Sequence, residues 1–181
     1  VELVISLIVL DFIIYMQHRI FHYLPFLWRF HKIHHIDHEM DVTTAIRFHP
    51  IEIFLSFFIK SAAIIILGIS PIAVIIFVII LNVSAMFSHG NITVPKKLDQ
   101  LLRLVIITPD MHRIHHCVIP SETNSNFGFN LSWWDKIFNT YKAHPSQGHD
   151  KMKNGLNEYQ DASQTNLMTL LLIPFGKQKT K

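Results

Sequence analysis

The sequence contains two near-copies of one short histidine string. Residues 31–35 and residues 112–116 both read H-x-x-H-H, and a looser H-x-x-x-H string occupies residues 18–22. Residues three and four apart share one face of a helix, so each string, if helical, should point its imidazoles the same way. Because neutral imidazole is a common protein ligand for transition metals, the three strings together predict a metal site.

Nine histidines are the candidate ligands, eight from the strings and one that lies alone between them. Zinc takes about four ligands and octahedral metals take six, so nine imidazoles favour two ions. Imidazole suits iron, zinc, copper or nickel and disfavours magnesium and calcium. No catalytic residue is assigned beyond the ligands. The predicted set is His18, His22, His31, His34, His35, His89, His112, His115 and His116.

Other histidines and one asparagine are less clearly placed. His38 follows the first H-x-x-H-H string by three residues, and His49 precedes a proline. His38 could join the cluster of that string, and His49 could support a ligand. His49, Asn91 near the lone histidine, or water could complete the coordination of one ion. His144 and His149 lie in a polar stretch without a spacing partner, which favours exposure to solvent over metal binding.

Two further residues lie close to the strings. Asp11 precedes His18 by about two helical turns, where it could orient that imidazole or make a polar helix–helix contact. Cys117, the single cysteine, directly follows the second H-x-x-H-H string and is interpreted as a small buried residue.

The elements that must position these histidines include a predicted membrane hairpin at about residues 51–88. Two apolar arms, 51–67 and 72–88, flank a Gly-Ile-Ser-Pro turn. Each arm would form a helix of roughly 25 Å, at the short end for crossing a hydrocarbon core of about 30 Å. Lys60, in the middle of the first arm, does not fit the pattern and could snorkel or face a helix partner.

The charges predict an orientation for the hairpin. Lys60 is the only one of the 16 Lys and Arg residues that lies between residues 51 and 88. By the positive-inside rule both ends of the hairpin, and the histidine strings with them, should face the cytoplasm. The net charge of +3 is spread along the chain without the basic runs of a nucleic-acid surface, so no nucleic-acid partner is expected.

Composition and patterning predict an all-α integral membrane protein. Half of the 181 residues are hydrophobic, only 16% are charged, and the mean hydropathy is +0.30. Residues 3–17 have the pattern of the end of a membrane helix, and because the chain begins at Val1 within this run we expect a missing upstream segment.

The chain is predicted to divide into one domain and a tail. The membrane helices and a histidine-lined helical cap should together form a domain at residues 1–142. Residues 143–181 should form a polar tail with a short interfacial segment at 166–175 and a basic end at Lys177, Lys179 and Lys181.

Several chemistries are disfavoured by missing motifs. The sequence has no H-E-x-x-H zinc-protease motif, no E-x-x-H of soluble di-iron bundles and no glycine-rich dinucleotide fingerprint. A two-metal centre at the membrane surface suits attack on a lipid chain by activated oxygen, in a dry, apolar surrounding that limits side reactions. Two alternative functions stay open. One is a membrane metal transporter, which should carry ionisable residues inside its spans. The other is a membrane zinc-dependent hydrolase, for which Glu39 is the candidate general base.

The order of these features resembles the fatty acid hydroxylase / sterol desaturase superfamily. The match includes Asp11 ahead of the first string, the Arg-Phe-His-Pro-Ile-Glu segment at 47–52, Asn-Phe-Gly at 126–128 and Trp-Asp-Lys-x-Phe-x-Thr-Tyr at 134–141. It covers roughly residues 11–142. The Gly-Leu-x-Glu-Tyr segment at 155–159 is similar to bacterial members.

The resemblance implies an integral-membrane di-iron oxygenase in which the histidine strings bind two iron ions. Such an enzyme would use O2 and two electrons to hydroxylate or desaturate a C–H bond of a lipid, such as a sterol or fatty acyl chain. A separate cytochrome b5- or ferredoxin-type protein would supply the electrons. The chain departs from some members in one respect, because His89 has no second histidine beside it.

Overall fold

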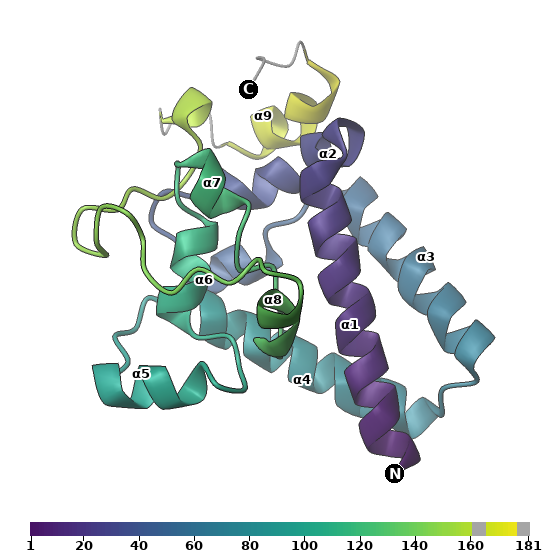
Figure 1. Ribbon diagram of the computed structural model, residues 1–181. Helices are drawn as coiled ribbons and strands as arrows, with labels where there is room; N and C mark the ends of the chain where they lie inside the picture. The colour runs from purple at the N-terminus through teal and green to yellow at the C-terminus, as the bar shows by residue number, and fades with distance from the viewer. Residues whose placement is uncertain (161–165, 177–181) are drawn as a thin grey trace.

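The structure is a computed structural model that describes residues 1–160 and 166–176. Within these residues the regular elements are helices, and only two isolated backbone bridges occur. This confirms the predicted all-α class. In chain order the elements are α1 (Glu2–Tyr23), α2 (Pro25–His35), η1 (Val42–Ile46), α3 (Pro50–Leu67), α4 (Pro71–His89), α5 (Lys96–Leu102), α6 (Pro109–His115), α7 (Pro120–Thr123), α8 (Trp133–Ile137), η2 (Asn157–Tyr159), α9 (Leu167–Leu172) and η4 (Ile173–Phe175) (Figure 1).

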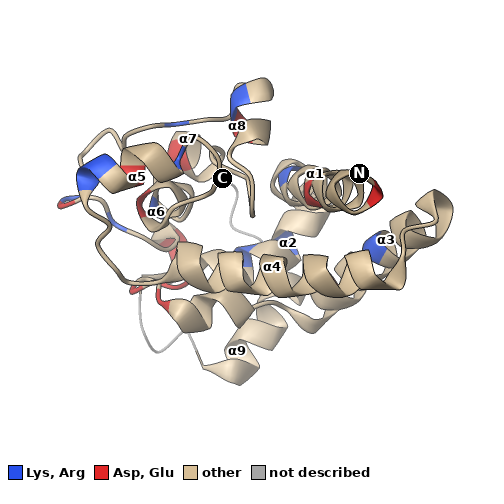
Figure 2. Cartoon of the chain, turned by 90° about the horizontal axis from the view of Figure 1, so that it is seen from below, with Lys and Arg blue, Asp and Glu red and all other residues tan. Residues whose placement is uncertain are grey.

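Three helices, α1, α3 and α4, are long and apolar enough to cross a membrane. The predicted hairpin is confirmed, since α3 and α4 begin and end within one residue of the two apolar arms. Gly68 ends α3 with φ of 64°, a left-handed conformation that favours glycine. Viewed from below, α3 and α4 are almost free of charged residues, which gather instead around α5, α6 and α7 (Figure 2).

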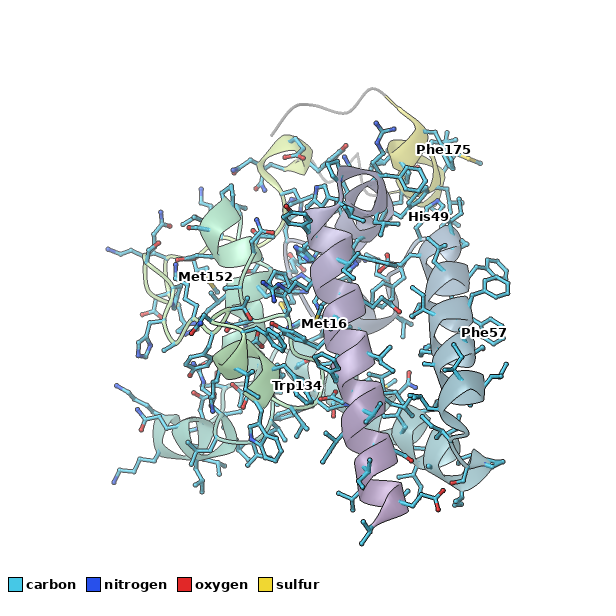
Figure 3. The ribbon with its side chains drawn as sticks, turned by 45° about the vertical axis from the view of Figure 1, so that its right-hand side comes forward. Met16, His49, Phe57, Trp134, Met152 and Phe175 are labelled. Carbon is cyan, nitrogen blue, oxygen red and sulfur yellow. The ribbon has the colours of Figure 1, made fainter. Side chains whose placement is uncertain are left out.

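The three long helices meet in a small apolar core. Leu10 and Ile14 of α1 pack against Phe77 of α4, and all three side chains are at most 3% exposed. In Figure 1, α1 and α3 lie side by side while α4 crosses behind α1 toward α6, and contacts join α1 to α3 and α4 to α6. Phe57 and Phe58 are more than half exposed. Phe57 lies on the outer side of α3 (Figure 3), where lipid would cover it.

Asp11 ties α1 to the loop that precedes α8. Its carboxylate accepts hydrogen bonds from the backbone N–H groups of Asn130 and Leu131, and from the indole N–H of Trp134 at 2.8 Å. Figure 3 places Trp134 beside α1. The hypothesis that Asp11 orients His18 is therefore wrong, because this carboxylate instead anchors a loop to the helix.

The C-terminal segment packs on α2. Leu156, Leu170 and Ile173 join a cluster around the buried Ile33 and Ile36. The predicted apolar segment at 166–175 thus corresponds to α9 and η4, and it combines this packing with strongly exposed leucines. The division of the chain at residue 142 stays a prediction, and the basic end predicted from Lys177, Lys179 and Lys181 lies outside the described residues.

Candidate metal centre

All nine predicted histidines gather inside the protein in two groups. In each group one nitrogen from every ring lies within 4.8 Å of the others. Every one of the nine side chains is buried, with at most 4% of its surface exposed. The five-histidine group is His18, His22, His31, His35 and His115. The four-histidine group is His34, His89, His112 and His116.

Each H-x-x-H-H string serves both groups, so the prediction that a string points in one direction is corrected. His31 and His35 belong to the five-histidine group, whereas His34 turns to the other. The reason is helical rotation, since positions i+3 and i+4 are separated by about 100° around the axis. The second string divides in the same way with the groups exchanged: His112 and His116 join the four-histidine group and His115 joins the five-histidine group.

Two short helices that begin with proline carry these strings. Pro25 opens α2 and Pro109 opens α6, each at a position where the missing backbone N–H costs nothing. The hydroxyl of Thr108 caps α6 by accepting from the N–H of Met111 at 3.4 Å. Both helices end within their strings, at His35 and His115. The first pair of histidines, in contrast, comes from the last turns of the long helix α1.

The side-chain nitrogens of the five-histidine group face one another at close range. The Nε2 atom of His18 lies 3.1 Å from Nε2 of His31 and 3.1 Å from Nε2 of His115. The Nε2 atom of His35 lies 3.1 Å from that of His22 and 3.2 Å from that of His31. Five ring nitrogens therefore converge on one point between α1, α2 and α6.

Hydrogen bonds at the far side of three rings assign their tautomers. The Nδ1–H of His18 donates to the carbonyl of Phe127 at 2.8 Å, and that of His115 donates to the carbonyl of Ser125 at 2.8 Å. The Nδ1–H of His31 donates to a carboxylate oxygen of Glu52 at 2.6 Å. Carbonyl and carboxylate oxygens only accept, so Nδ1 holds the proton and each Nε2 presents a lone pair.

Facing lone pairs at this distance repel one another unless a cation lies between them. Two metal–nitrogen bonds of about 2.1 Å at a right angle would separate the nitrogens by about 3.0 Å, and a tetrahedral angle would give about 3.4 Å. The observed 3.1–3.2 Å separations lie within the range expected for nitrogens that share one metal ion. The residues present therefore fit a metal ion.

Burial keeps these imidazoles neutral and able to act as ligands. It lowers the pKa of His115 to about 3. Burial, followed by the neighbouring imidazoles, also holds the pKa of His34, His35, His112 and His116 well below the usual value of 6.5. Neutral imidazole is the form that binds metals.

The ring nitrogens of the four-histidine group also converge, but fewer of its rings are held by hydrogen bonds at their outer nitrogens. The Nε2 atom of His89 lies 3.0 Å from that of His34 and 3.1 Å from that of His112. His89 donates through Nδ1 to the carbonyl of Ala85 at 2.7 Å. The ring of His34 stacks on Phe48, with 4.4 Å between the ring centroids. Among the described residues, the Nδ1 atoms of three members have no hydrogen-bond partner: His34, His112 and His116.

The remaining histidines lie outside both groups. His49 caps α3, because its Nδ1 accepts from the N–H of Ile51 at 3.1 Å. His38 is partly buried. His144 is exposed as predicted, whereas the prediction for His149 is wrong, because this side chain is partly buried. Asn91, the other candidate for completing an ion, is exposed, unlike the nine grouped histidines. Cys117 is buried, which confirms its interpretation.

Sequence reasoning gave no role to Glu52 or to the carbonyls that orient His18 and His115. Glu52 carries the only carboxylate of α3, which was an available signal. The carbonyls belong to residues 125–128, where sequence patterns indicate a turn but not which atoms point inward. The side chain of Asp135 shapes this turn by accepting from the N–H groups of Phe127 and Gly128 at 2.8 and 2.9 Å.

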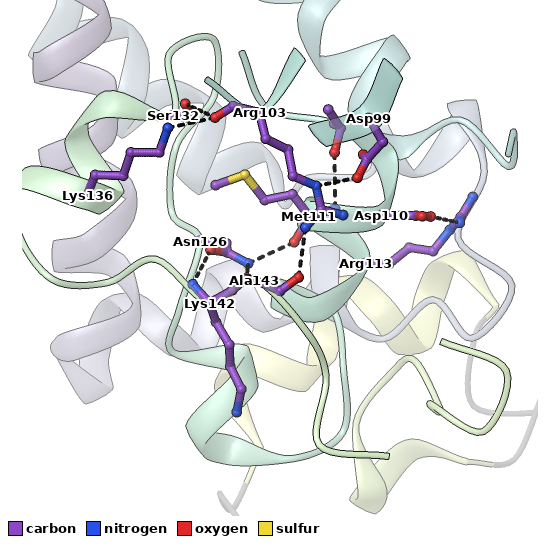
Figure 4. Close-up of polar contacts among 11 residues, drawn as sticks. Asp99, Arg103, Asp110, Met111, Arg113, Asn126, Ser132, Lys136, Lys142 and Ala143 are labelled. Carbon is purple, nitrogen blue, oxygen red and sulfur yellow. Dashed lines mark hydrogen bonds and ion pairs between the residues drawn. The ribbon is translucent and has the colours of Figure 1, made fainter. Parts of the chain in front are cut away.

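The 125–128 turn is also bound to α6. The side-chain amide of Asn126 donates to the carbonyls of Met111 and Lys142, and its oxygen accepts from the N–H of Lys142 (Figure 4). Asn126 has φ of 51°, a left-handed conformation that asparagine tolerates. At Gly128 an added Cβ would lie 2.6 Å from a methyl carbon of Ile107 and 2.8 Å from a backbone oxygen, so the turn needs glycine there.

A cavity of about 300 Å³ adjoins the five-histidine group. Its walls come mainly from α1, α3 and α4, and most of the lining side chains are apolar. His18 and His31 form part of its lining, and no member of the four-histidine group does. A ligand in this cavity would therefore contact the five-histidine group directly, whereas Phe48 and Ala85 of the lining would separate it from His34 and His89.

Comparison with known proteins gives a consistent picture. The family model described as fatty acid hydroxylase matches residues 3–140. An ornithine lipid hydroxylase, OlsE, from Rhizobium tropici is 30% identical over 145 residues, which cover 80% of this chain and 43% of that protein. An alkylglycerol monooxygenase from Caenorhabditis elegans is 31% identical over 141 residues, which cover 74% of this chain and 25% of that protein. A very-long-chain aldehyde decarbonylase, GL1-7, from Oryza sativa subsp. japonica is 24% identical over 170 residues, covering 89% and 26%.

The chain spans less than half the length of each of these relatives. No solved structure matches it. The three apolar helices and the family match together identify the chain as an integral membrane protein.

Proposed function

Because this chain belongs to the fatty acid hydroxylase family, we propose that it is the core of a membrane di-iron oxygenase. The enzyme would use O2 and externally supplied electrons to hydroxylate or desaturate a C–H bond of a lipid such as a sterol or fatty acyl chain. One observation carries this proposal: two adjacent buried histidine groups have converging nitrogens, and one of them, the five-histidine group, adjoins an apolar cavity between helices that can span a membrane.

The five-histidine group would hold one iron ion and the four-histidine group the other. Bound iron would supply the redox chemistry, in which O2 is reduced with two external electrons and two protons. In hydroxylation one oxygen atom would enter the lipid and the other would leave as water, whereas in desaturation the lipid would lose two hydrogens and both oxygen atoms would leave as water. Glu52 and the carbonyls of Ser125 and Phe127 keep three ligands in the tautomer that presents Nε2. The apolar walls of the cavity exclude water, which limits side reactions.

The substrate class follows from the cavity and from what the relatives are named for. Those names refer to an ornithine lipid, an alkylglycerol and a very-long-chain aldehyde, all of which contain long hydrocarbon parts. A cavity with apolar walls inside the membrane-spanning helices suits such a chain. A separate electron carrier of the cytochrome b5 or ferredoxin type would complete the reaction, and the positive-inside rule favours histidine groups near the cytoplasmic surface.

The two alternative functions have less support. Glu39, the candidate general base of a zinc-dependent hydrolase, is exposed and outside both groups. Glu52 is close enough to the five-histidine group to be considered as a general base, but its carboxylate already accepts a hydrogen bond from His31. A metal transporter needs ligands along a path through the membrane, whereas the nine histidines gather in two adjacent groups.

A labelling experiment would test the proposal. Membranes from cells that express the protein, and cells that express the His31→Ala variant, would be incubated with ¹⁸O2 and a reductant system, and their lipids analysed by mass spectrometry. We expect a lipid product in the parent that is absent in the variant, either carrying ¹⁸O or two hydrogens lighter. Protein that holds iron but gives no O2-dependent product from any lipid class would overturn the proposal.

A further inference from the structure

The cavity beside the five-histidine group contains one basic residue, Lys60, among its mainly apolar lining. Lys60 lies within the membrane-spanning part of α3. No hydrogen bond or ion pair is found for its amine among residues 1–160 and 166–176. An ionisable group inside a membrane span is costly unless it faces a partner, so such residues commonly mark a ligand path.

The direction of the side chain favours the cavity over the nearer end of the hairpin. In a helix the Cα–Cβ bond tilts toward the N-terminus, so the Lys60 side chain leans back toward Ser56 and the histidines. The nearer end, at Leu67, lies the opposite way. Snorkelling toward that end would require the amine to turn against this tilt. The outer side of α3, which would face lipid, carries exposed apolar residues such as Phe57 (Figure 3).

Two other polar residues line the same cavity near Lys60. Ser56 precedes it by one helical turn, and Asn82 comes from α4, where its amide N–H donates to the carbonyl of Val78 at 2.7 Å. An ammonium group offers three hydrogen-bond donors and no acceptor, and a hydroxyl can donate as well. The positive charge of the ammonium therefore suits a ligand that supplies negative charge and acceptor oxygens at this end of the cavity.

The opposite end of the same cavity is formed by the five-histidine group. Glu52, which supports His31, lies eight residues before Lys60 on α3, or about 12 Å along the helix axis. Both residues line the cavity together with His18. The cavity thus joins a cationic end to a metal-binding end through walls such as Ile14, Val78 and Leu81.

We propose that Lys60 anchors the anionic head group of a lipid, a carboxylate or a phosphate, whose hydrocarbon chain extends through the cavity toward His18 and His31. The fate of that chain rests on the proposed function, whereas the binding itself does not. A fixed head group would also fix which carbon of the chain reaches the histidines. Lys60 is in this sense a specificity-determining residue.

Equilibrium binding to the detergent-purified protein would test the anchor without O2 or electrons. The probes are palmitate with its neutral methyl ester, and dipalmitoyl phosphatidic acid with neutral dipalmitoylglycerol. We expect at least one anionic probe to bind roughly tenfold more tightly than its neutral counterpart. Lys60→Met should remove that preference while leaving the neutral probe unaffected. Lys60→Arg should retain it, and Lys97→Met, at an exposed lysine outside the cavity, should leave it unchanged.

The pattern of results separates the anchor from the catalytic proposal. A preference for palmitate identifies the carboxylate as the ligand, and a preference for phosphatidic acid identifies the phosphate. No preference in the parent, or a preference that survives Lys60→Met, overturns the anchor even if lipid oxidation is observed. A preference that depends on Lys60 without any lipid oxidation supports the anchor and counts against the proposed function. Thermal unfolding of Lys60→Met at the parent temperature would establish that the variant is folded.

Discussion

The two histidine groups are made of the same kind of ligand, yet their surroundings differ. In the five-histidine group the outer nitrogens of His18, His31 and His115 donate to oxygen acceptors at 2.6–2.8 Å. In the four-histidine group only His89 has such an acceptor among the described residues. The apolar cavity reaches the first group and not the second.

This difference suggests that the two groups have different roles. Hydrogen bonds at the outer nitrogen fix the orientation of a ligand and make it more basic, so the five-histidine group is the better prepared metal site. Because the cavity adjoins that group, we infer that its ion faces the lipid chain. The four-histidine group depends more on ring packing, as in the stack of His34 on Phe48.

Removal of one ligand from each group should have the largest effect and should differ between the groups. His112→Ala would leave three imidazoles in its group, whereas His35→Ala would leave four. We expect His112→Ala to weaken binding of one ion by more than the roughly 10–100-fold that loss of a supporting hydrogen bond costs. His35→Ala should weaken binding of the other ion by a smaller factor. Metal titration of both variants measures this, and equal losses would contradict the proposed asymmetry.

Glu52→Gln should selectively weaken the five-histidine group. The amide that replaces the carboxylate keeps its size but loses the negative charge that holds the Nδ1 proton of His31. We expect affinity for one ion to fall roughly 10–100-fold while the second ion is retained. Glu2→Gln, at the exposed start of α1, is the matched control. Loss of both ions together would mean that the groups do not act separately.

Gly128→Ala tests whether the 125–128 turn is the support that distinguishes the groups. The added methyl group would overlap Ile107 and displace the turn whose carbonyls hold His18 and His115. We expect a loss of about 2 kcal/mol in the free energy of unfolding, with weaker binding of one ion. Gly176→Ala is the control, because the nearest atom to its Cβ would be 3.7 Å away. Unchanged stability would show that the turn adapts.

Substitution of Glu122, which lies just before the turn that carries Ser125, should have the smallest effect, and that effect is on the free energy of unfolding. Burial raises the pKa of Glu122, but hydrogen bonds from the N–H of Ser146 and the ammonium of Lys142 outweigh it and bring the pKa to about 2. A carboxyl group with a lowered pKa stabilises the fold above its unfolded value of 4.5, and this stabilisation is lost as pH falls toward 2.

We therefore expect Glu122→Gln to lower stability by about 1–2 kcal/mol at pH 7. The difference from the parent should shrink between pH 4.5 and pH 2. Thermal unfolding of both proteins across this range provides the measurement. A difference that is independent of pH would mean that the charge of Glu122 has no part in it.

The sequence predicted those features that depend on local periodicity. The apolar arms predicted α3 and α4 almost to the residue. Histidine spacing selected eight of the nine side chains that the structure brings together, and His89 was selected as the lone histidine at the end of the hairpin. Periodicity could not divide a string between two groups, because that division depends on which helices face each ring. Asp11 illustrates the same limit, since its partners lie about 120 residues away in the chain.

Backbone acceptors and cavities were also beyond prediction. Any residue can present a carbonyl, so nothing in the side chains of Ser125 or Phe127 marks them as supports for histidines. Lys60 was recognised as an exception within an apolar helix, but its position in the lining of a cavity depends on how α1 and α4 pack against α3.

Metal analysis of the detergent-purified protein tests the central claim most directly. The parent would be compared with a His115→Ala, His116→Ala double variant, which removes one ligand from each group. The two groups predict close to two iron ions per chain in the parent after anaerobic loading, and a marked loss in the double variant. Zinc held tightly with no iron would contradict the oxygenase. No stoichiometric metal under any loading condition would contradict the assignment of these histidines as ligands.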